Sequence, residues 1–204
     1  AASDVYKRQY LYCGLSRDAS KEEILERINN NTITDILNKI EVKAGDVVMV
    51  KAGTIHAIGA GVFICEIQQN SNCTYRMYDY DRRDKFGNPR ELHVKKALDV
   101  VDNHKYIKDN KTEVVIARNE HFTEERLVQC KYFEVYKYDV NDEAKITVDE
   151  ASFVSVLFIN GSGTIETDDY EKTMEFKAGD SFFVSAGLRS IIVKGRATMV
   201  VTRV

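Results

Sequence analysis

Hydrophobic and polar residues alternate with helical spacing in three places along the chain. Residues 20–23, Ser-Lys-Glu-Glu, form a capping box, which predicts a short helix that begins directly after it. Across 33–40, apolar residues recur at i, i+3, i+4 and i+7, and this spacing predicts a second helix. A third helix is predicted over 92–102, where four apolar residues share one face. These helices are expected to be scaffold.

Most other apolar residues lie in short runs of β type. The β-branched run 47–50, the return run 54–58 and the apolar run 62–69 predict three strands in the first half. The second half contains strand-like runs alone: TEVVIA, VQCKYFEVYKYDV, KITV, SFVSVLFI, GTIET and ATMVVTRV, with a Gly-Ser-Gly turn at 161–163. Strands this short and closely spaced are typical of a β-sandwich or a small barrel.

One strand-turn-strand unit occurs twice. The segment 43–61, KAGDVVMVKAGTIHAIGAG, is matched at a constant offset by 177–195, KAGDSFFVSAGLRSIIVKG. Two copies of one β unit predict two similar β domains. His56 lies just past a tight turn in the first copy and is expected to face the space that the sheet encloses. The second copy has Ser190 at this position, so any chemistry is expected in the first domain.

Composition and charge narrow the class of protein. The 204 residues are 44% hydrophobic, enough for one or two cores, and no apolar run reaches the roughly 20 residues of a membrane span. A net charge of −3, without a basic patch interleaved with aromatics, argues against a nucleic-acid partner. The four cysteines lack C-x-x-C spacing and no secretory h-region is visible, which favours the reducing cytoplasm.

A polar and aromatic loop, residues 70–93, follows the first β unit. Loops held on a rigid sheet often carry binding groups. Arg76 could stabilise negative charge or clamp a phosphate, but it could equally pair with Asp79 or Asp81 at the surface. Glu66 interrupts an apolar run, where a carboxylate is costly unless it is paired or bound to a metal. This cost favours a position for Glu66 inside the barrel.

The three histidines other than His56 are expected to be capping or surface residues. His93 lies at the start of the third predicted helix, His104 lies just past its end, and His121 lies in a charged turn. None of them belongs to a pair with the spacing of metal ligands.

Four runs of the sequence together resemble a known family. AGTIHAIGAG, EIQQNS, TYRMYDYDRRD and GNPRELHVKKALDVVD, in this order, closely resemble the short bacterial form of class I mannose-6-phosphate isomerase, a zinc enzyme of the cupin superfamily. The resemblance covers most of the chain from Tyr10 to Val204. It implies a mainly β fold with two cupin-type β-barrels or jelly rolls, the first incomplete at its N-terminal side, with a small helical insertion and a connecting helix.

Domain boundaries follow from this resemblance. Residues 1–9 look like a cloning or sequencing remnant rather than native sequence. Residues 10–40 are expected to form the helical insertion, and residues 41–108 the remainder of the catalytic cupin domain with its connecting helix. Residues 109–204 are expected to form a C-terminal cupin domain without a metal site.

The resemblance also implies an activity and its residues. The family interconverts mannose 6-phosphate and fructose 6-phosphate through an enediol, so a sugar phosphate is the expected partner. The zinc-ligating histidine of A-G-T-x-H corresponds to His56. The active-site arginine of T-Y-R corresponds to Arg76, and the pocket glutamate of E-I-Q-Q corresponds to Glu66. Arg82 and Lys85 are further candidates for substrate binding. No membrane partner is expected, and the sequence does not indicate an oligomeric state.

Two departures from the family pattern change this expectation. Asn72 stands where the family usually has an aspartate, which removes a carboxylate near Arg76. The family also takes a histidine and a glutamate ligand from a segment upstream of Tyr10, and a catalytic Zn²⁺ takes about three protein ligands. We therefore expect a C-terminal fragment with weak zinc binding and low activity. The alternatives are a non-catalytic sugar-phosphate-binding or regulatory cupin protein and, ranked last, another metal-dependent cupin such as an oxygenase.

Overall fold

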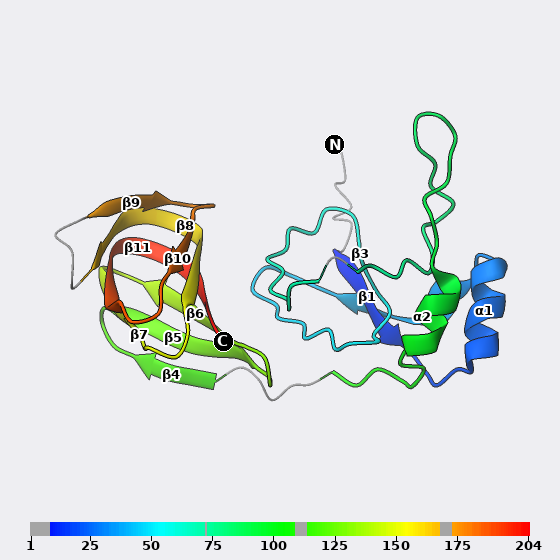
Figure 1. Ribbon diagram of the computed structural model, residues 1–204, viewed down its shortest axis with the longest axis horizontal. Coiled ribbons are helices and arrows are strands. Elements are labelled where there is room, and N and C mark those ends of the chain that lie inside the picture. The colour runs from blue at the N-terminus through cyan, green and yellow to red at the C-terminus, as the bar shows by residue number, and fades with distance from the viewer. Residues whose placement is uncertain (1–8, 72, 109–113, 168–172) are drawn as a thin grey trace, which may run out of the picture. The chain divides into compact units, whose positions relative to one another are not determined.

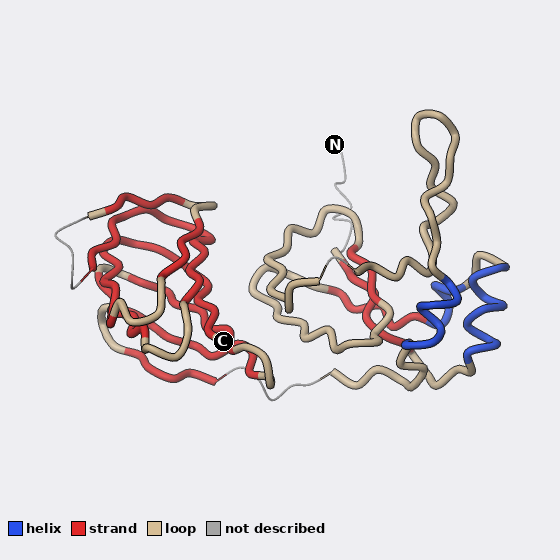
Figure 2. Tube along the Cα trace, viewed as in Figure 1, coloured by secondary structure: helices blue, strands red, loops and turns tan. Residues whose placement is uncertain are grey.

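The computed structural model describes residues 9–71, 73–108, 114–167 and 173–204. The chain divides into two compact units, Ala1–Lys108 and Asp109–Val204, and each has its own hydrophobic core. Strands dominate the second unit, whereas long loops make up much of the first (Figures 1 and 2). The suggestion that residues 1–9 are a remnant concerns residues that, except for Gln9, lie outside the described part.

The first unit begins with a strand and a capped helix. Strand β1, Tyr10–Leu15, leads into helix α1, Lys21–Asn29. The Ser20 hydroxyl accepts a hydrogen bond from the Glu23 amide at 3.1 Å, which is the N-cap contact that the capping box predicts. Two isoleucines of α1 are buried in the core of this unit.

The predicted helix over 33–40 is wrong. Ile33–Ile36 form a short 3-10 helix, η1, and strand β2, Leu37–Glu41, follows directly. β2 pairs with β1, which on its other side pairs with β3, His56–Ile58, and both pairings are antiparallel. The first three apolar residues of the 33–40 pattern are buried in this conformation. These apolar side chains are therefore buried without a helix, and β1 supplies the hydrogen-bond partners for the backbone of β2.

The strands predicted over 47–50 and 62–69 are absent as well. Both segments have no regular secondary structure, and the strand predicted over 54–58 is reduced to β3. A strand needs a neighbour for its N–H and C=O groups, and the sheet β2-β1-β3 gives neither segment one within the residues described. Phe63 is accordingly 95% exposed.

Helix α2, Val94–Val100, confirms the third predicted helix in a shorter form. Its Ala97 is buried and contributes to its attachment to the first unit. The core of this unit consists of Leu15, Ala19, Ile24, Ile28, Ile33, Ile36, Leu37 and Val101. Neither of the two α-helices in the described ranges is long and apolar enough to cross a membrane.

The second unit is a single antiparallel sheet of eight strands, counted over the residues described. Its strand order is β10-β8-β11-β6-β5-β4, with β7 paired to β11 and β9 paired to β8. The strands are β4 Val114–Arg118, β5 Phe122–Gln129, β6 Glu134–Val140, β7 Glu143–Val148, β8 Val154–Thr167, β9 Met174–Lys177, β10 Ser181–Val184 and β11 Arg189–Arg203. The long strand β11 pairs with β7 along its first half and with β6 along its second. This succession lets the sheet roll around its core (Figure 1).

Glycines permit the bend in the two long strands. The predicted turn at 161–163 lies instead within β8, where it pairs with residues 195–197 of β11. A Cβ atom at Gly161 would lie 1.9 Å from the Arg196 carbonyl oxygen, and Gly161 has φ +89°. Any side chain at this position would therefore force the two backbones apart.

Aromatic stacking fills the core of the second unit. The Phe158 and Phe176 rings lie 3.7 Å apart and nearly parallel, and Phe182 meets Phe158 edge-on at 5.9 Å. The remaining core side chains are mostly branched aliphatic residues that alternate along the strands. The prediction of a mainly β protein built from antiparallel strands is confirmed.

Candidate functional site

The turn before β3 sets the orientation of His56. Gly53 has φ +82° and the Thr54 amide donates to the Lys51 carbonyl at 3.1 Å, which reverses the chain. His56 Nδ1 lies 3.0 Å from the Thr54 carbonyl oxygen. A carbonyl can only accept, so Nδ1 carries the proton and Nε2 keeps its lone pair. This is the tautomer in which histidines commonly bind metals through Nε2.

The His56 side chain is exposed and does not face an enclosed space as expected. β3 is an edge strand of its sheet, and Ile58, which shares a face with His56, is 50% exposed. In the described part of the chain, this face of β3 is therefore uncovered.

Glu66 is also exposed, in the irregular segment 62–69, and not buried in a strand as the sequence predicted. Among the described residues, no group of three or more histidine, cysteine, aspartate or glutamate side chains could hold a metal ion. A catalytic zinc takes about three protein ligands. His56 thus has the geometry of one donor, and the described residues do not by themselves fit a complete zinc site.

Arg76 is held by the segment that precedes α2. Its amide donates to His93 Nδ1 at 3.2 Å, and its carbonyl accepts from the His93 amide at 2.7 Å. Its guanidinium Nη1 donates to the Glu91 carbonyl oxygen at 3.1 Å. Among the described residues, Arg76 does not form the alternative ion pair with Asp79 or Asp81; Arg82 pairs with Asp79 and Arg83 with Asp81.

A narrow arm, residues 80–92, leaves the unit beside α2 and returns to it; Figure 1 shows it in green above the helix. Arg83 and Pro89 face each other as an isolated β-bridge. At the tip, the Asp84 carboxylate accepts from the Phe86 amide at 2.8 Å and the Asn88 amide at 2.9 Å. These hydrogen bonds lower the pKa of Asp84 and keep the turn closed.

A buried carboxylate joins the two ends of the arm. Asp79 is 7% exposed, and its Oδ1 accepts from Arg82 Nη2 at 2.5 Å and lies 3.7 Å from Arg90 Nη1. Its Oδ2 is buried without a hydrogen-bond partner. The Arg82 side chain remains 63% exposed, and Lys85 lies at the tip, 5.0 Å from the Phe86 ring. Of the two substrate-binding candidates, Arg82 lies at the base of the arm and Lys85 at its end.

All five candidate residues lie in the first unit, but no hydrogen bond or ion pair joins any two of them within the described ranges. A shared core connects His56 with Arg76 indirectly. Ile55, next to His56, and Met77, next to Arg76, both pack against it. The effect of Asn72 on Arg76 stays a prediction, because Asn72 lies outside the described residues.

Sequence reasoning missed the roles of His93 and Asp79. No spacing identifies the partner of His93, because Arg76 precedes it by a whole loop. Asp79 is only three residues from Arg82, but its burial and its second partner, Arg90, depend on how the arm folds. A histidine directly before a helix was interpreted as a cap, yet His93 makes no side-chain capping bond to α2.

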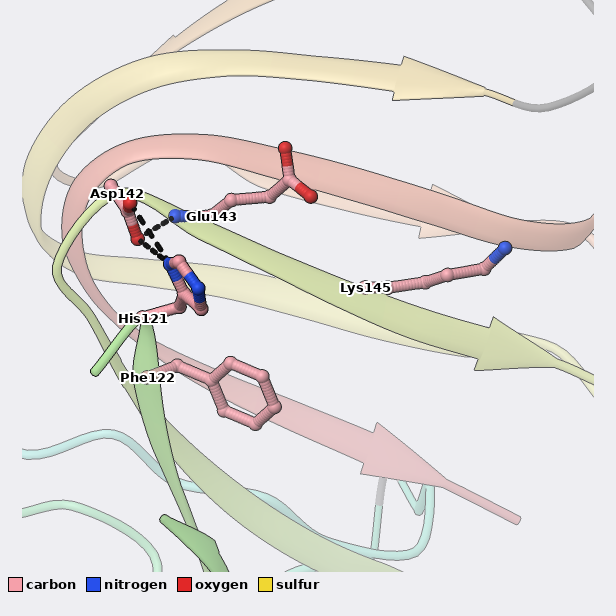
Figure 3. Close-up of a pocket in the computed structure, with 5 residues that line it drawn as sticks. All are labelled: His121, Phe122, Asp142, Glu143 and Lys145. Atoms are coloured by element: carbon pink, nitrogen blue, oxygen red, sulfur yellow. Dashed lines mark hydrogen bonds and ion pairs between the residues drawn. The ribbon is translucent and has the colours of Figure 1, made fainter. Parts of the chain in front are cut away.

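His121, in the second unit, is a surface residue as expected. Its Nδ1 lies 2.9 Å from one Asp142 oxygen and 3.0 Å from the other, at the edge of a pocket of about 270 Å³ (Figure 3). The hydrogen bond with Asp142 raises the pKa of His121, and the same bond lowers the pKa of Asp142. The pocket is lined by His121, Phe122, Asp142, Glu143 and Lys145.

We expect the variant His121→Gln to lose stability relative to the parent chain mainly between about pH 4 and pH 6.5. The raised pKa of His121 adds stability that is complete below its unfolded value, about 6.5, and is lost as pH rises through the folded value. The lowered pKa of Asp142 adds stability that is complete above about 3.9 and is lost as pH falls through the folded value. Urea midpoints measured from pH 3 to pH 9 test this window.

The matched control is Lys194→Gln, which removes another surface ion pair, with Glu166, at 2.7 Å. A lysine stays charged throughout this window, so the control should shift the midpoint equally at pH 5.5 and pH 8. A pH-independent effect of His121→Gln would contradict the expectation.

The rolled antiparallel sheet of the second unit, together with the sequence pattern that segments 43–61 and 177–195 share, is typical of a cupin-type protein. Residues 123–204 match the family described as "Mannose-6-phosphate isomerase, cupin domain". The chain also matches the crystal structure of mannose 6-phosphate isomerase from Bacillus subtilis, with a TM-score of 0.86 and 35% identity over 97% of this chain and 61% of that one. Residues 123–204 belong to the mannose-6-phosphate isomerase cupin-domain family, and the similarity to mannose-6-phosphate isomerases extends over most of the chain.

Two relatives from Bacillus subtilis (strain 168) extend the comparison. The protein YvyI is 40% identical over 91% of this chain and 57% of its own length. Mannose-6-phosphate isomerase ManA is 33% identical over 90% of this chain and 56% of its own length. The chain thus spans a little over half the length of these curated relatives.

Proposed function

We propose that this chain takes part in the zinc-dependent interconversion of mannose 6-phosphate and fructose 6-phosphate. The observation that carries the proposal is the state of Arg76. Its guanidinium is fixed by a neutral backbone carbonyl, that of Glu91, and not by a carboxylate. Its positive charge is therefore available to a substrate. The name of ManA, which is similar over most of this chain, supports the choice of reaction.

The chemistry needs a fixed positive charge at this kind of site. Moving a proton between C1 and C2 of the sugar places negative charge on O1 or O2 of an enediolate. Preorganised donors stabilise such charge best where they cost no reorganisation during the reaction. Arg76 is held both at its backbone and at one guanidinium nitrogen, and its remaining N–H groups can donate to the substrate. We assign this stabilising role to Arg76.

The other candidates receive roles that their positions allow. Glu66 is proposed to line the pocket beside the metal and to take part in proton transfer. Arg82 is proposed to bind the phosphate, since its guanidinium is anchored by Asp79 yet largely exposed. Lys85, at the tip of the arm, is proposed to contact the substrate from outside. The expected compartment is the cytoplasm.

Within this chain, we assign zinc binding to one residue, His56. His56 Nε2 is free to bind a metal because Nδ1 donates to the Thr54 carbonyl. The described residues do not complete a site, so no reaction step is assigned to the metal. We propose that other donors lie outside them, and that the chain alone binds zinc weakly and turns over slowly.

The experiment measures zinc affinity and isomerisation on the same preparation. We expect weak zinc binding in a chelator competition, and a loss of at least about tenfold in affinity for His56→Asn because one donor is removed. The control His104→Asn changes an exposed histidine that pairs with Asp102 and should leave the affinity unchanged. Coupling fructose 6-phosphate formation to a dehydrogenase gives the rate.

Three outcomes would contradict parts of this proposal. Tight, stoichiometric zinc binding that survives His56→Asn would remove the role of His56. A normal rate from the chain alone would remove the expectation of slow turnover. Sugar-phosphate binding with no measurable turnover at saturating zinc would instead favour the alternative of a non-catalytic binding protein.

A further inference from the structure

The imidazole of His93 supports Arg76, although it occupies the position that usually caps a helix. His93 is the residue directly before α2, and its side chain makes no hydrogen bond to that helix. Its Nδ1 instead accepts from the Arg76 amide at 3.2 Å. The His93 amide in turn donates to the Arg76 carbonyl at 2.7 Å. Two hydrogen bonds thus connect the same two residues across the base of the arm.

The contact with Arg76 also determines the tautomer of His93. An imidazole nitrogen that accepts a hydrogen bond carries no proton, so in the neutral ring the proton is on Nε2. Nε2 lies 3.9 Å from a carboxylate oxygen of Glu91, beyond hydrogen-bond distance. Among the described residues, the hydrogen bond of this ring is therefore the one that Nδ1 accepts from the Arg76 amide.

Support for Arg76 extends from His93 into the helix. The His93 carbonyl accepts from the Ala97 amide at 2.9 Å, as the first acceptor of α2. Ala97 is buried in the first unit. The Glu91 carbonyl, which holds the Arg76 guanidinium, is two residues before His93. Backbone and side chain of Arg76 are thus both attached to one short segment that continues into a packed helix.

We propose that His93 is a positioning residue for Arg76, acting through Nδ1. This inference rests on the proposed role of Arg76 as the group that stabilises the enediolate. Without the acceptor, the Arg76 amide would lose its partner and the guanidinium could shift away from the substrate. A misplacement of about 1 Å can cost on the order of 100-fold in rate.

Three substitutions separate this role from simple packing. In His93→Asn, the side-chain amide can place an oxygen near the position of Nδ1, whereas in His93→Gln it reaches toward the position of Nε2. His93→Ala supplies neither. We expect hydrogen exchange of the Arg76 amide, followed by NMR, to quicken about fivefold or more in the Gln and Ala variants and to stay near the parent rate in the Asn variant.

Activity gives a second measurement on the same variants. We expect kcat to fall on the order of 100-fold in the Gln and Ala variants, with KM changed only a few fold, and to be largely retained in the Asn variant. His104→Ala is the matched control, because His104 is exposed and pairs with Asp102. It should change neither measurement.

The amide measurement needs no turnover, so it distinguishes the two proposals. One outcome is that the chain shows no isomerase activity while hydrogen exchange of the Arg76 amide is still faster in the Gln and Ala variants than in the parent chain. In that case the positioning inference stands and the proposed function fails. If the Arg76 amide exchanges at the parent rate in all three variants, the positioning inference fails. It also fails if the Asn variant matches the Ala variant in exchange while its far-UV spectrum stays native.

Discussion

Isomerisation of mannose 6-phosphate should fall about 100-fold to 1,000-fold when Arg76 is replaced by alanine. The variant removes a fixed positive charge from the position where the enediolate would form, and loss of one preorganised donor typically costs this much. Arg76→Lys should recover only part of the rate. A lysine keeps the charge but lacks the planar group that donates to the Glu91 carbonyl while leaving other N–H groups for the proposed contact with the substrate. The coupled assay at saturating zinc measures both variants.

The control for this prediction is Arg83→Ala. Arg83 is an exposed arginine of the arm, residues 80–92, and pairs with Asp81 at 3.0 Å; its replacement should change the rate by less than about twofold. If turnover is too slow to compare, binding of an aldonic acid phosphate replaces it, since that ligand carries a carboxylate near the enediolate position. Equal losses in the Arg76 and Arg83 variants would contradict a specific role for Arg76.

Phe158→Ala should destabilise the second unit by about 3–5 kcal/mol, the usual cost of removing a large buried aromatic side chain. Phe158 is 0% exposed, stacks on Phe176 with ring centroids 3.7 Å apart, and meets Phe182 edge-on. Its strand, β8, is paired with β11 on one side and with β10 on the other, which leaves little freedom to close the cavity. Urea unfolding followed by amide signals of the second unit measures the change, because two units need not unfold together.

Phe183→Ala provides the comparison within the same unit. Phe183 stacks on Phe153 at 4.7 Å but is 68% exposed on the edge strand β10. Its removal should cost about 1 kcal/mol or less, since little apolar surface is taken from water. Comparable losses for the two variants would mean that the aromatic stack around Phe158 is not the main source of stability.

Local chemistry explains which elements could be predicted from the sequence. The capping contact of Ser20 involves residues three positions apart, so the sequence contains all of it. Strand β7 alternates exposed and buried residues along its whole length, and this alternation is visible in the sequence. The segments 33–40 and 62–69 were assigned wrongly because their conformation depends on whether a partner strand lies beside them.

Near strand β5 the prediction is wrong in a different way, because one predicted strand is two strands in the structure. The sequence run at 128–140 was interpreted as one strand, but a turn closed by Cys130 and Phe133 divides it. The charged residues before it, in the first part of β5, gave no strand signal. Glu124 is nevertheless compatible with a half-buried strand, because the Tyr138 hydroxyl donates to it at 2.6 Å from the neighbouring strand β6.

The candidate site could be predicted only in part. The family motifs alone identify His56, Glu66 and Arg76, by resemblance. The exposure of His56, the tautomer of its ring and the support of Arg76 by His93 depend on contacts made after folding. His93 and Arg76 are separated by a whole loop, and the tautomer of His56 depends on how its ring is oriented toward the Thr54 carbonyl, so no spacing rule reveals these contacts.

The buried carboxylate of Asp79 has a consequence for variation in this family. It joins Arg82 and Arg90 at the root of the arm, and the contacts that hold Arg76, with Glu91 and His93, also lie away from the tip. Insertions or deletions at 84–88 would change the reach of the arm while its root stays closed. Under the proposed function, a change of loop length there would alter how far the arm reaches toward a sugar phosphate and would leave Arg76 in place.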